Sequence, residues 1–447
     1  MSRPAKPPRS HEQKLEPIVS ALRAQATRAV PAHIAKAGVR HVVPIPHDPR
    51  RSTSGIDISA LDEILEIDAQ ARTCTAEPGV PFWQLATAAL GFGLLPAVVP
   101  ELEGITVGGA VAGCSVESTS FRHGGFHDSC LAYEVVTGGG AALELSPERE
   151  PFLFEMMHGS YGTLGVLTRL TFRLVPARRF VRLEYQSFPN ADSFDTAMRE
   201  RCAAGDYDFV DGIIHSPRKF VLCLGRFADA TPYLSTYRRR EIYYKSTARR
   251  LEDCLTTLDY CFRYDADCHW LTRAVPPLEW KPVRRLFGSA LLGSTNLIGW
   301  AKRLEPLLAL KRRPDVVSDV FLPARRFGQF YRWYERAFAF FPLWVVPYRM
   351  PRPYPFLNAD RAQRMQDELF VDCAIYGKPN TGPQDDSKVL EDKVFELDGF
   401  KALIGRNHYT RERFWEVFNR ESYEAAKARL DPEGVFPGIF EKLHRVE

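Results

Sequence analysis

The chain has 447 residues, more than one compact core usually holds, so we expect two or three domains. Hydrophobic residues make up 45% and charged residues 26%, as in ordinary globular proteins. The net charge of +4 and the lack of a dominant basic block give no indication of nucleic acid as a partner. No apolar run is long enough to span a bilayer, and the start lacks the apolar stretch of a secretory signal. We therefore expect a cytoplasmic protein.

The first 177 residues alternate short helix and strand patterns, with glycines between them. In chain order they predict a helix over 11–30, a strand over 39–44, a polar turn over 50–55, strand character with a short turn of helix over 56–67, a strand over 73–76 and a helix over 82–90. Residues 135–145 predict a β-hairpin around three glycines, and 169–175 alternates as a half-buried strand that Pro176 ends. This part is predicted to be a mixed domain.

A shift in composition follows, because most tryptophans lie in residues 178–395. The apolar spacing over 251–262 predicts an amphipathic helix. Strands are predicted over 316–322 and 343–348 on either side of an aromatic helix over 327–340, and a polar loop over 379–387. Thr410 is an N-cap candidate for a helix that buries aromatic side chains.

Nine cysteines are present, and no two form a C-x-x-C pair. Cys254, Cys261 and Cys268 fall seven residues apart, which predicts that they share one stripe of a helix. A metal or redox site is one interpretation of this spacing. Buried free thiols on a packed helix face are the interpretation that we prefer.

Two segments of small residues are the strongest local signals. One runs over 106–118 (TVGGAVAGCSVES) and the other over 159–166 (GSYGTLGV). A pyrophosphate needs backbone N–H groups aimed at it, and small residues let the backbone come close enough. Neither segment matches G-x-G-x-x-G or a P-loop, and each alone also fits a tight turn between strands.

In combination, these segments resemble a known family. The stretch over 100–109, Glu117-Ser118, Tyr133 to Val136 and the segment over 162–166 resemble the FAD-binding domain of the vanillyl-alcohol-oxidase superfamily. Shorter pieces over 320–323, 342–347, 374–377, 411–418 and 436–437 resemble its Δ24-sterol reductase branch. The resemblance implies an α+β fold, with a PCMH-type FAD-binding domain of two α/β subdomains and an α+β cap domain with an antiparallel sheet.

The resemblance also implies domain boundaries and cofactors. Residues 1–177 would form the FAD-binding domain, 178–395 the cap, and 396–447 a segment that packs back on the FAD-binding domain. FAD would bind non-covalently, with NADPH as its hydride donor. The implied cofactor-binding residues are Thr106, Val107, Gly108, Gly109, Gly113, Ser115, Glu117 and Ser118 at the pyrophosphate and flavin edge, and Gly162, Thr163, Gly165 and Val166 at the adenosine half.

One segment departs from the family pattern. Most members carry an arginine- and glycine-rich pyrophosphate loop between the first two strands. Here residues 46–55 hold a single glycine, and Arg50, Arg51, Ser52 and Ser54 would have to replace backbone donors by charge and hydroxyl groups. We expect no metal.

Reduction of an unactivated double bond needs a proton donor opposite the flavin. The cap should supply it, because a phenol or an imidazole held in an apolar pocket can donate a proton. The candidates are Tyr409, His269, Tyr376 and Asp319. For each of them an ordinary structural hydrogen bond is the alternative.

The stretch over 286–300 is apolar and has basic residues on both sides. One interpretation is a contact with the periphery of a membrane or the mouth of a lipid pocket. The other is a buried helix with charged ends.

These observations leave three hypotheses for function. The first is an FAD-dependent reductase of a carbon–carbon double bond in a sterol or isoprenoid-type lipid. The second keeps the fold but reverses the chemistry, as an oxidase or dehydrogenase of an alcohol or polyol. The third is a flavin-free lipid-binding or scaffold protein.

Overall fold

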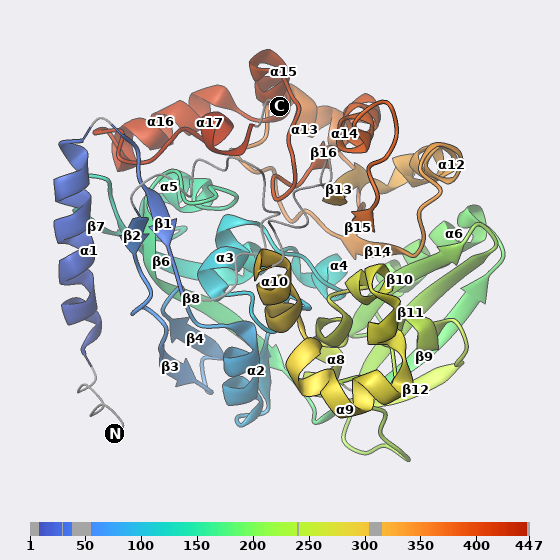
Figure 1. The fold of residues 1–447 in the computed structure, drawn as a ribbon. Coiled ribbons are helices and arrows are strands. Elements are labelled where there is room, and N and C mark those ends of the chain that lie inside the picture. Colours follow the sequence, from blue (N-terminus) through green and yellow to red (C-terminus); the bar gives the residue numbers. More distant parts are fainter. Residues whose placement is uncertain (1–8, 29, 38–54, 239–240, 304–314, 445–447) are drawn as a thin grey trace.

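Two sheets, both antiparallel throughout, organise the chain (Figure 1). The computed structural model describes residues 9–28, 30–37, 55–238, 241–303 and 315–444. The predicted strand over 39–44 and most of the loop over 46–55 lie outside these residues. A small parallel pair, β1 (His33–Ala35) and β2 (Gly55–Asp57), completes the strands.

The six-stranded sheet is built by the first part of the chain. Its order is β3 (Ile64–Asp68), β4 (Thr73–Ala76), β8 (Val166–Pro176), β6 (Cys130–Val136) and β7 (Ala142–Leu145), and β5 (Leu94–Pro96) pairs with β8. The helices of this part are α2 (Phe82–Leu90), α3 (Val107–Ala112), α4 (Ser120–His123) and α5 (Pro151–Met156). The strands at 73–76 and 166–176, the hairpin and the helix at 82–90 confirm the predictions for this part.

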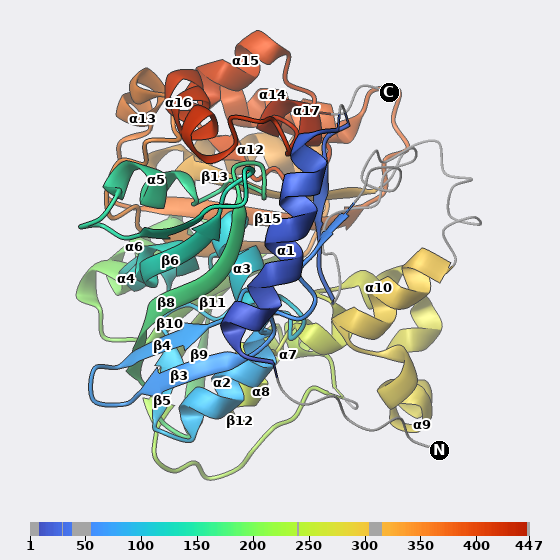
Figure 2. The same cartoon turned by 90° about the vertical axis from the view of Figure 1, so that its left-hand side faces the viewer.

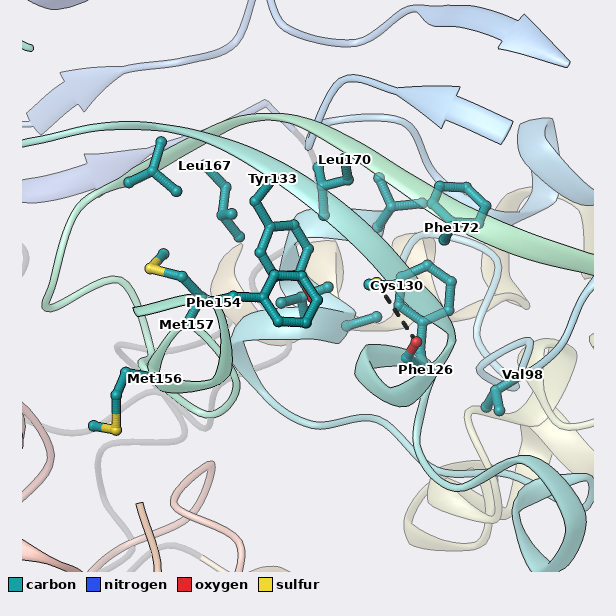
Figure 3. Close-up of a cluster of buried hydrophobic side chains, with 14 of the residues drawn as sticks. Val98, Phe126, Cys130, Tyr133, Phe154, Met156, Met157, Leu167, Leu170 and Phe172 are labelled. Atoms are coloured by element: carbon teal, nitrogen blue, oxygen red, sulfur yellow. Dashed lines mark hydrogen bonds between the residues drawn. The ribbon is translucent and has the colours of Figure 1, made fainter. Parts of the chain in front are cut away.

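Aromatic side chains fill the core beside this sheet. Figure 3 shows Tyr133 stacked on Phe154, with Phe126 and Phe172 in edge contact nearby. Helices from the other end of the chain enter the same core: α15 (Arg411–Val417), α16 (Arg420–Leu430) and α17 (Ile439–Leu443). As predicted, Thr410 caps α15, since its side chain accepts a hydrogen bond from the Arg413 amide.

The eight-stranded sheet is built by the middle of the chain. Its order is β12 (Glu252–Thr256), β9 (Phe180–Phe188), β11 (Lys219–Ala228), β10 (Phe209–Ser216), β14 (Leu343–Tyr348), β15 (Phe370–Lys378), β13 (Val316–Pro323) and β16 (Phe400–Lys401). Helices α6 (Ala191–Ala204), α12 (Phe327–Ala337) and α14 (Asp386–Glu396) pack on one face, and that face is apolar. The α+β fold class is confirmed.

The chain leaves the eight-stranded sheet for the last time after residue 401. Strand β16 pairs with β13, so residues 400–401 still belong to the eight-stranded sheet. Phe356 and Leu357 already lie in the first core, and the chain enters it again from Leu403 onward. Phe400 pairs with Phe321, and the rings of these two residues stack 5.0 Å apart, which holds β16 at the edge of the sheet.

The helix predicted over 251–262 is wrong in its first half. Residues 252–256 form edge strand β12 beside β9, and only α8 (Thr257–Cys261) is helical. A short apolar run fits both the helical and the strand period, and pairing with β9 makes residues 252–256 a strand. Cys254 therefore lies in a strand, Cys261 in a helix, and Cys268 in a turn with φ 42°, so the three do not share a helix stripe. All three are buried free thiols.

Residues 286–300 do not form one buried helix. They lie in α9 (Lys281–Leu291) and α10 (Ser294–Arg303), which project from the body on the right of Figure 2. Several of their apolar side chains are exposed. Within the described ranges, no helix combines the length and apolar character needed to cross a membrane.

Helix α1 (His11–Ala26) is attached to the first part by buried charges. His11 contacts Glu77 and Glu134, each at 2.8 Å, and Lys14 contacts Glu77 at 2.9 Å. The hydrogen bonds to Glu134 and then Glu77 raise the pKa of His11 to about 9. The histidine is therefore positively charged near neutral pH and holds two carboxylates together.

We predict that His11→Ala lowers the free energy of unfolding by about 3 kcal/mol at pH 6, because it leaves buried Glu77 without one partner. The folded pKa of His11 is raised from 6.5 to about 9, so its contribution is complete below pH 6.5 and is lost as the pH rises through 9. Urea unfolding at pH 6 and pH 10 measures both values. Glu16→Ala, on the exposed side of α1, is the control. An equal loss at both pH values would contradict the assignment.

Candidate active site

The two small-residue segments lie directly against each other. The Gly159 amide donates to the Val111 carbonyl at 3.3 Å, and the Tyr161 amide donates to the Ala112 carbonyl at 3.1 Å. Residues far apart in the sequence therefore form one continuous surface at the end of α3. This adjacency is what a shared ligand requires.

One face of α3 is accessible. Gly109, Ala112 and Gly113, spaced as i, i+3 and i+4, are partly exposed, whereas Val107 and Val111 are buried. Residues 114–116, which continue from α3, are also partly exposed. The Lys36 ammonium donates to the Thr106 hydroxyl at 3.2 Å, which places a positive charge beside the beginning of this face.

The backbone of this segment differs from the expectation that its amides face a ligand. Many of them already donate within the protein: Val107 to Val80, Gly108 to Pro78, Gly109 to the Thr106 hydroxyl, Gly113 to Gly109, Ser115 to Ala110, Glu117 to the Ser120 hydroxyl and Ser118 to Glu117. The glycine at 108 is required by packing, because a Cβ there would lie 2.5 Å from the Pro78 side chain. What the segment offers a ligand is a smooth surface of small side chains.

The second segment is accessible only at Tyr161 and Gly162. Tyr161 and Gly162 are partly exposed, with φ of 49° and 65°, while Thr163, Gly165 and Val166 are buried. The Lys442 ammonium donates to the carbonyls of Tyr161 and Gly162 at 2.6 and 3.2 Å. Of the four adenosine-side candidates, Gly162 is therefore the one that the structure leaves open to a ligand.

A buried ion pair joins the first segment to the eight-stranded sheet. Arg263 contacts Glu117 at 2.9 Å and Asp211 of β10 at 3.2 Å, and its side chain is fully buried. The Tyr260 hydroxyl donates to the Ser118 hydroxyl at 3.1 Å. Burial raises the pKa of Glu117 to about 7, although the Arg263 charge lowers it. The side chains of Glu117 and Ser118 thus connect two parts of the fold.

His269 lies near this junction. Its Nε2 is 2.8 Å from Glu101 Oε1, and its ring stacks on Tyr264. Burial raises the pKa of Glu101, but the hydrogen bond and charge of His269, together with a backbone hydrogen bond and the Arg263 charge, outweigh burial, so the pKa lies below its usual value. His269 and the preceding Cys268 have φ of 64° and 42°. Two adjacent non-glycine residues in this region are uncommon, and such strain tends to occur at functional sites.

Tyr376 connects His269 with Asp319. The Tyr376 ring centroid lies 4.3 Å from that of His269, and its hydroxyl donates to Asp319. Burial raises the pKa of Asp319 to about 7, although the hydrogen bond from Tyr376 lowers it. Burial also raises the pKa of Asp372 far above its usual value, and the charge of Glu101 adds to this shift.

Alternation along the strands explains why these groups meet. In β13, Val320 and Leu322 point into the apolar core under α12 and α14, so Asp319 points to the opposite face. In β15, Val371, Cys373 and Ile375 occupy the same apolar core, which leaves Asp372 and Tyr376 on the other face. We call Glu101, His269, Asp319, Asp372 and Tyr376 the acid cluster.

Tyr409 does not join the acid cluster. It is buried in the core around the C-terminal helices, with its ring 6.2 Å from that of Phe395. Its hydroxyl has no hydrogen-bond partner within the part of the chain that the structure describes. Tyr409 is a catalytic candidate because it precedes a helix that resembles the family. Its position in the sequence, however, does not say which way its side chain points. The structure therefore separates one of four catalytic candidates from the other three.

Glu101, Asp211, Asp372 and Arg263 belong to these networks but are not among the residues predicted from the sequence. Asp372 had a signal, since it stands alone in the apolar run Phe370-Val371-Asp372-Cys373-Ala374-Ile375. Asp211 and Asp319 each interrupt an apolar strand in the same way. A lone carboxyl group in a buried strand is costly unless it has a partner or is kept neutral, which makes it a useful marker. Arg263 carried no comparable signal.

Comparisons with known proteins agree with this architecture. Residues 15–146 match the family model of an FAD binding domain. The Delta(24)-sterol reductase of Homo sapiens is 26% identical over 408 residues, which cover 88% of this chain and 78% of that protein. The Delta(24)-sterol reductase of Arabidopsis thaliana is 24% identical over 430 residues, covering 87% and 76%.

A more distant match lies outside that group. Cytokinin dehydrogenase 2 of Oryza sativa subsp. japonica is 28% identical over 218 residues, which cover 44% of this chain and 38% of that protein. Of the matches described, those to the sterol reductases cover most of this chain. The chain is an FAD-dependent oxidoreductase whose sequence is similar to the Delta(24)-sterol reductases over most of its length.

Proposed function

We propose that the protein reduces a carbon–carbon double bond in a sterol or isoprenoid-type lipid, with FAD as cofactor and NADPH as hydride donor. The names and long coverage of the sterol reductases among its relatives support this substrate class. The observation that carries the proposal is the acid cluster, where a carboxyl group with a pKa of about 7 lies beside a phenol on a partly buried sheet face.

The accessible face of α3 fits an extended flavin nucleotide. Gly109, Ala112 and Gly113 present no side chain larger than a methyl group, so a flat ring system can lie close to the backbone. Tyr161 and Gly162 extend this surface toward the second segment, and Lys36 supplies positive charge for a phosphate at its other end. When bound, FAD supplies the hydride that one carbon of the double bond receives.

The other carbon must receive a proton, and Asp319 and Tyr376 are placed to provide it. A carboxyl group with a pKa near 7 is about half protonated at neutral pH, which is the condition for efficient proton donation. Tyr376 links Asp319 to His269, and the ionised Glu101 orients the imidazole. We therefore assign Asp319 as proton donor, Tyr376 as the group that conducts the proton or positions the carboxyl, and His269 as a positioning residue.

Flavin content and hydride source are tested together. We expect purified protein to show the absorption of oxidised flavin and to be bleached by anaerobic NADPH titration. A Δ24-unsaturated sterol should then restore the absorption. Bleaching by alcohols but not by NADPH would replace the proposal with the oxidase or dehydrogenase hypothesis. Protein that stays colourless after FAD is added would replace it with the flavin-free one.

We predict that Ala112→Leu weakens FAD binding at least tenfold, because a larger side chain on the accessible face of α3 would occupy the space of the ring system. Ala88→Leu is the matched control, since Ala88 is a partly exposed alanine on α2. Fluorescence titration of apoprotein with FAD gives both affinities. Equal affinities for the two variants would show that the cofactor does not lie on this face.

We predict that Asp319→Asn lowers the rate of sterol-dependent flavin reoxidation by a factor of about 100 or more, because the amide cannot donate an acidic proton. In the unmodified protein this rate should fall about tenfold for each pH unit above 7, as Asp319 loses its proton. The variant should lose this dependence. Stopped-flow absorption measures the rate, and Ser318→Ala, whose side chain lies on the opposite face of β13, is the control. A pH profile that Asp319→Asn leaves unchanged would contradict the assignment.

A further inference from the structure

Helix α9 buries a charge and exposes its large apolar residues. Arg284 is 1% exposed and forms an ion pair with Asp267 through two hydrogen bonds of 2.6 and 3.1 Å. Two positions further on, Leu286 and Phe287 are 71% and 56% exposed. A surface helix normally buries its apolar side. The Arg284 pair fixes the reverse orientation, which costs hydrophobic stabilisation and therefore calls for an explanation.

The exposed apolar residues form one surface. Val283, Leu286, Phe287 and Ala290 follow the i, i+3, i+4, i+7 spacing, so they share a side of α9. The indole of Trp300 in α10 donates to the Ala290 carbonyl at 3.4 Å, so that ring continues the stripe. Trp280, just before α9, is 60% exposed. We call Trp280, Val283, Leu286, Phe287, Ala290 and Trp300 the apolar stripe.

The charged residues within the segment that carries this surface have one sign. Between residues 280 and 303 the sequence contains five lysines and arginines and no aspartate or glutamate. Arg284 is buried, while Lys281, Arg285 and Arg303 are exposed. Such a surface attracts an anionic partner and repels a second copy of itself. Aromatic and aliphatic side chains with a basic border are typical of elements that lie in the interface of a bilayer.

We propose that the apolar stripe docks on the surface of an anionic lipid bilayer, with α9 lying in the interface and the basic residues among the headgroups. The contact is peripheral, since only a few side chains project. This inference rests on exposure and charge and does not depend on the proposed chemistry.

The apolar stripe is connected to the candidate site through α10. At the beginning of α10, the Ser294 hydroxyl donates to Asp265 at 2.5 Å, and Asp265 also accepts from the Glu103 amide at 3.0 Å. Glu103 lies in the loop between Glu101 of the acid cluster and the segment over 106–118. A bilayer that contacts α9 and α10 therefore lies next to the candidate site, where a lipid substrate is needed.

Vesicle co-sedimentation of the full-length flavoprotein tests the proposal. We expect binding to vesicles of 70% phosphatidylcholine and 30% phosphatidylserine, and binding at least tenfold weaker to pure phosphatidylcholine, since each basic residue near an anionic surface contributes about fivefold. Leu286→Ser with Phe287→Ser should lower the partition coefficient at least tenfold on the anionic vesicles. Arg285→Glu should lower it by a smaller factor and make it less sensitive to salt.

Phe92→Ser with Leu251→Ser is the matched control, because both side chains are exposed, at 57% and 80%, and lie outside α9 and α10. This control should keep full binding. Circular dichroism and flavin absorption verify that all variants are folded, so a loss of binding reports on the surface. The proposal is overturned if the unmodified protein ignores anionic vesicles, if the Leu286/Phe287 variant binds as well as the control, or if it only changes the oligomeric state.

Discussion

The buried contact of Arg263 with Glu117 and Asp211 is the constraint on which the rest of the architecture depends. It takes a full positive charge out of water between the small-residue segment and the eight-stranded sheet. Such an arrangement adds little net stability, but removing one partner leaves a buried charge uncompensated. Its effect is therefore geometric: it favours one relative position of the two parts. The stacked side chains of Tyr260 and Tyr264, 4.3 and 4.8 Å from the guanidinium, shield it further.

With the two parts held in this way, the two faces of the eight-stranded sheet have different surroundings. One face buries aliphatic side chains against α6, α12 and α14, which makes the strands rigid. The other face carries a second apolar cluster, which includes Trp344, Val346 and Ala374, and Asp319, Asp372 and Tyr376 lie on this same face. A site built on such strands places its groups with little freedom, which is what proton donation to one carbon of a substrate needs. The acid cluster uses the rigidity that the apolar face provides.

Those helices and strands that rest on a local sequence pattern could be predicted. The helix at 82–90, the hairpin and the strands at 316–323 and 343–348 follow from periodicity and turn residues, and the family resemblance identified the cofactor. The strand at 252–256 could not be predicted, because pairing with β9 overrides an ambiguous apolar run. The acid cluster was predicted in part: His269, Tyr376 and Asp319 meet, but Tyr409 does not. Glu101 is 168 residues from the histidine it contacts, and no local pattern records such a pairing.

The return of the chain between Phe400 and Leu403 has a consequence for how the protein is made. Strand β16 adds an edge to the eight-stranded sheet, and the helices that follow complete the first core. While the ribosome is still synthesising residues 403–443, the part of the protein that was made first lacks Phe414, Phe418 and Leu430 from its interior. The core of the N-terminal half therefore stays incomplete until its last helices are synthesised. A nascent chain with such an incomplete core exposes apolar surface to which chaperones bind.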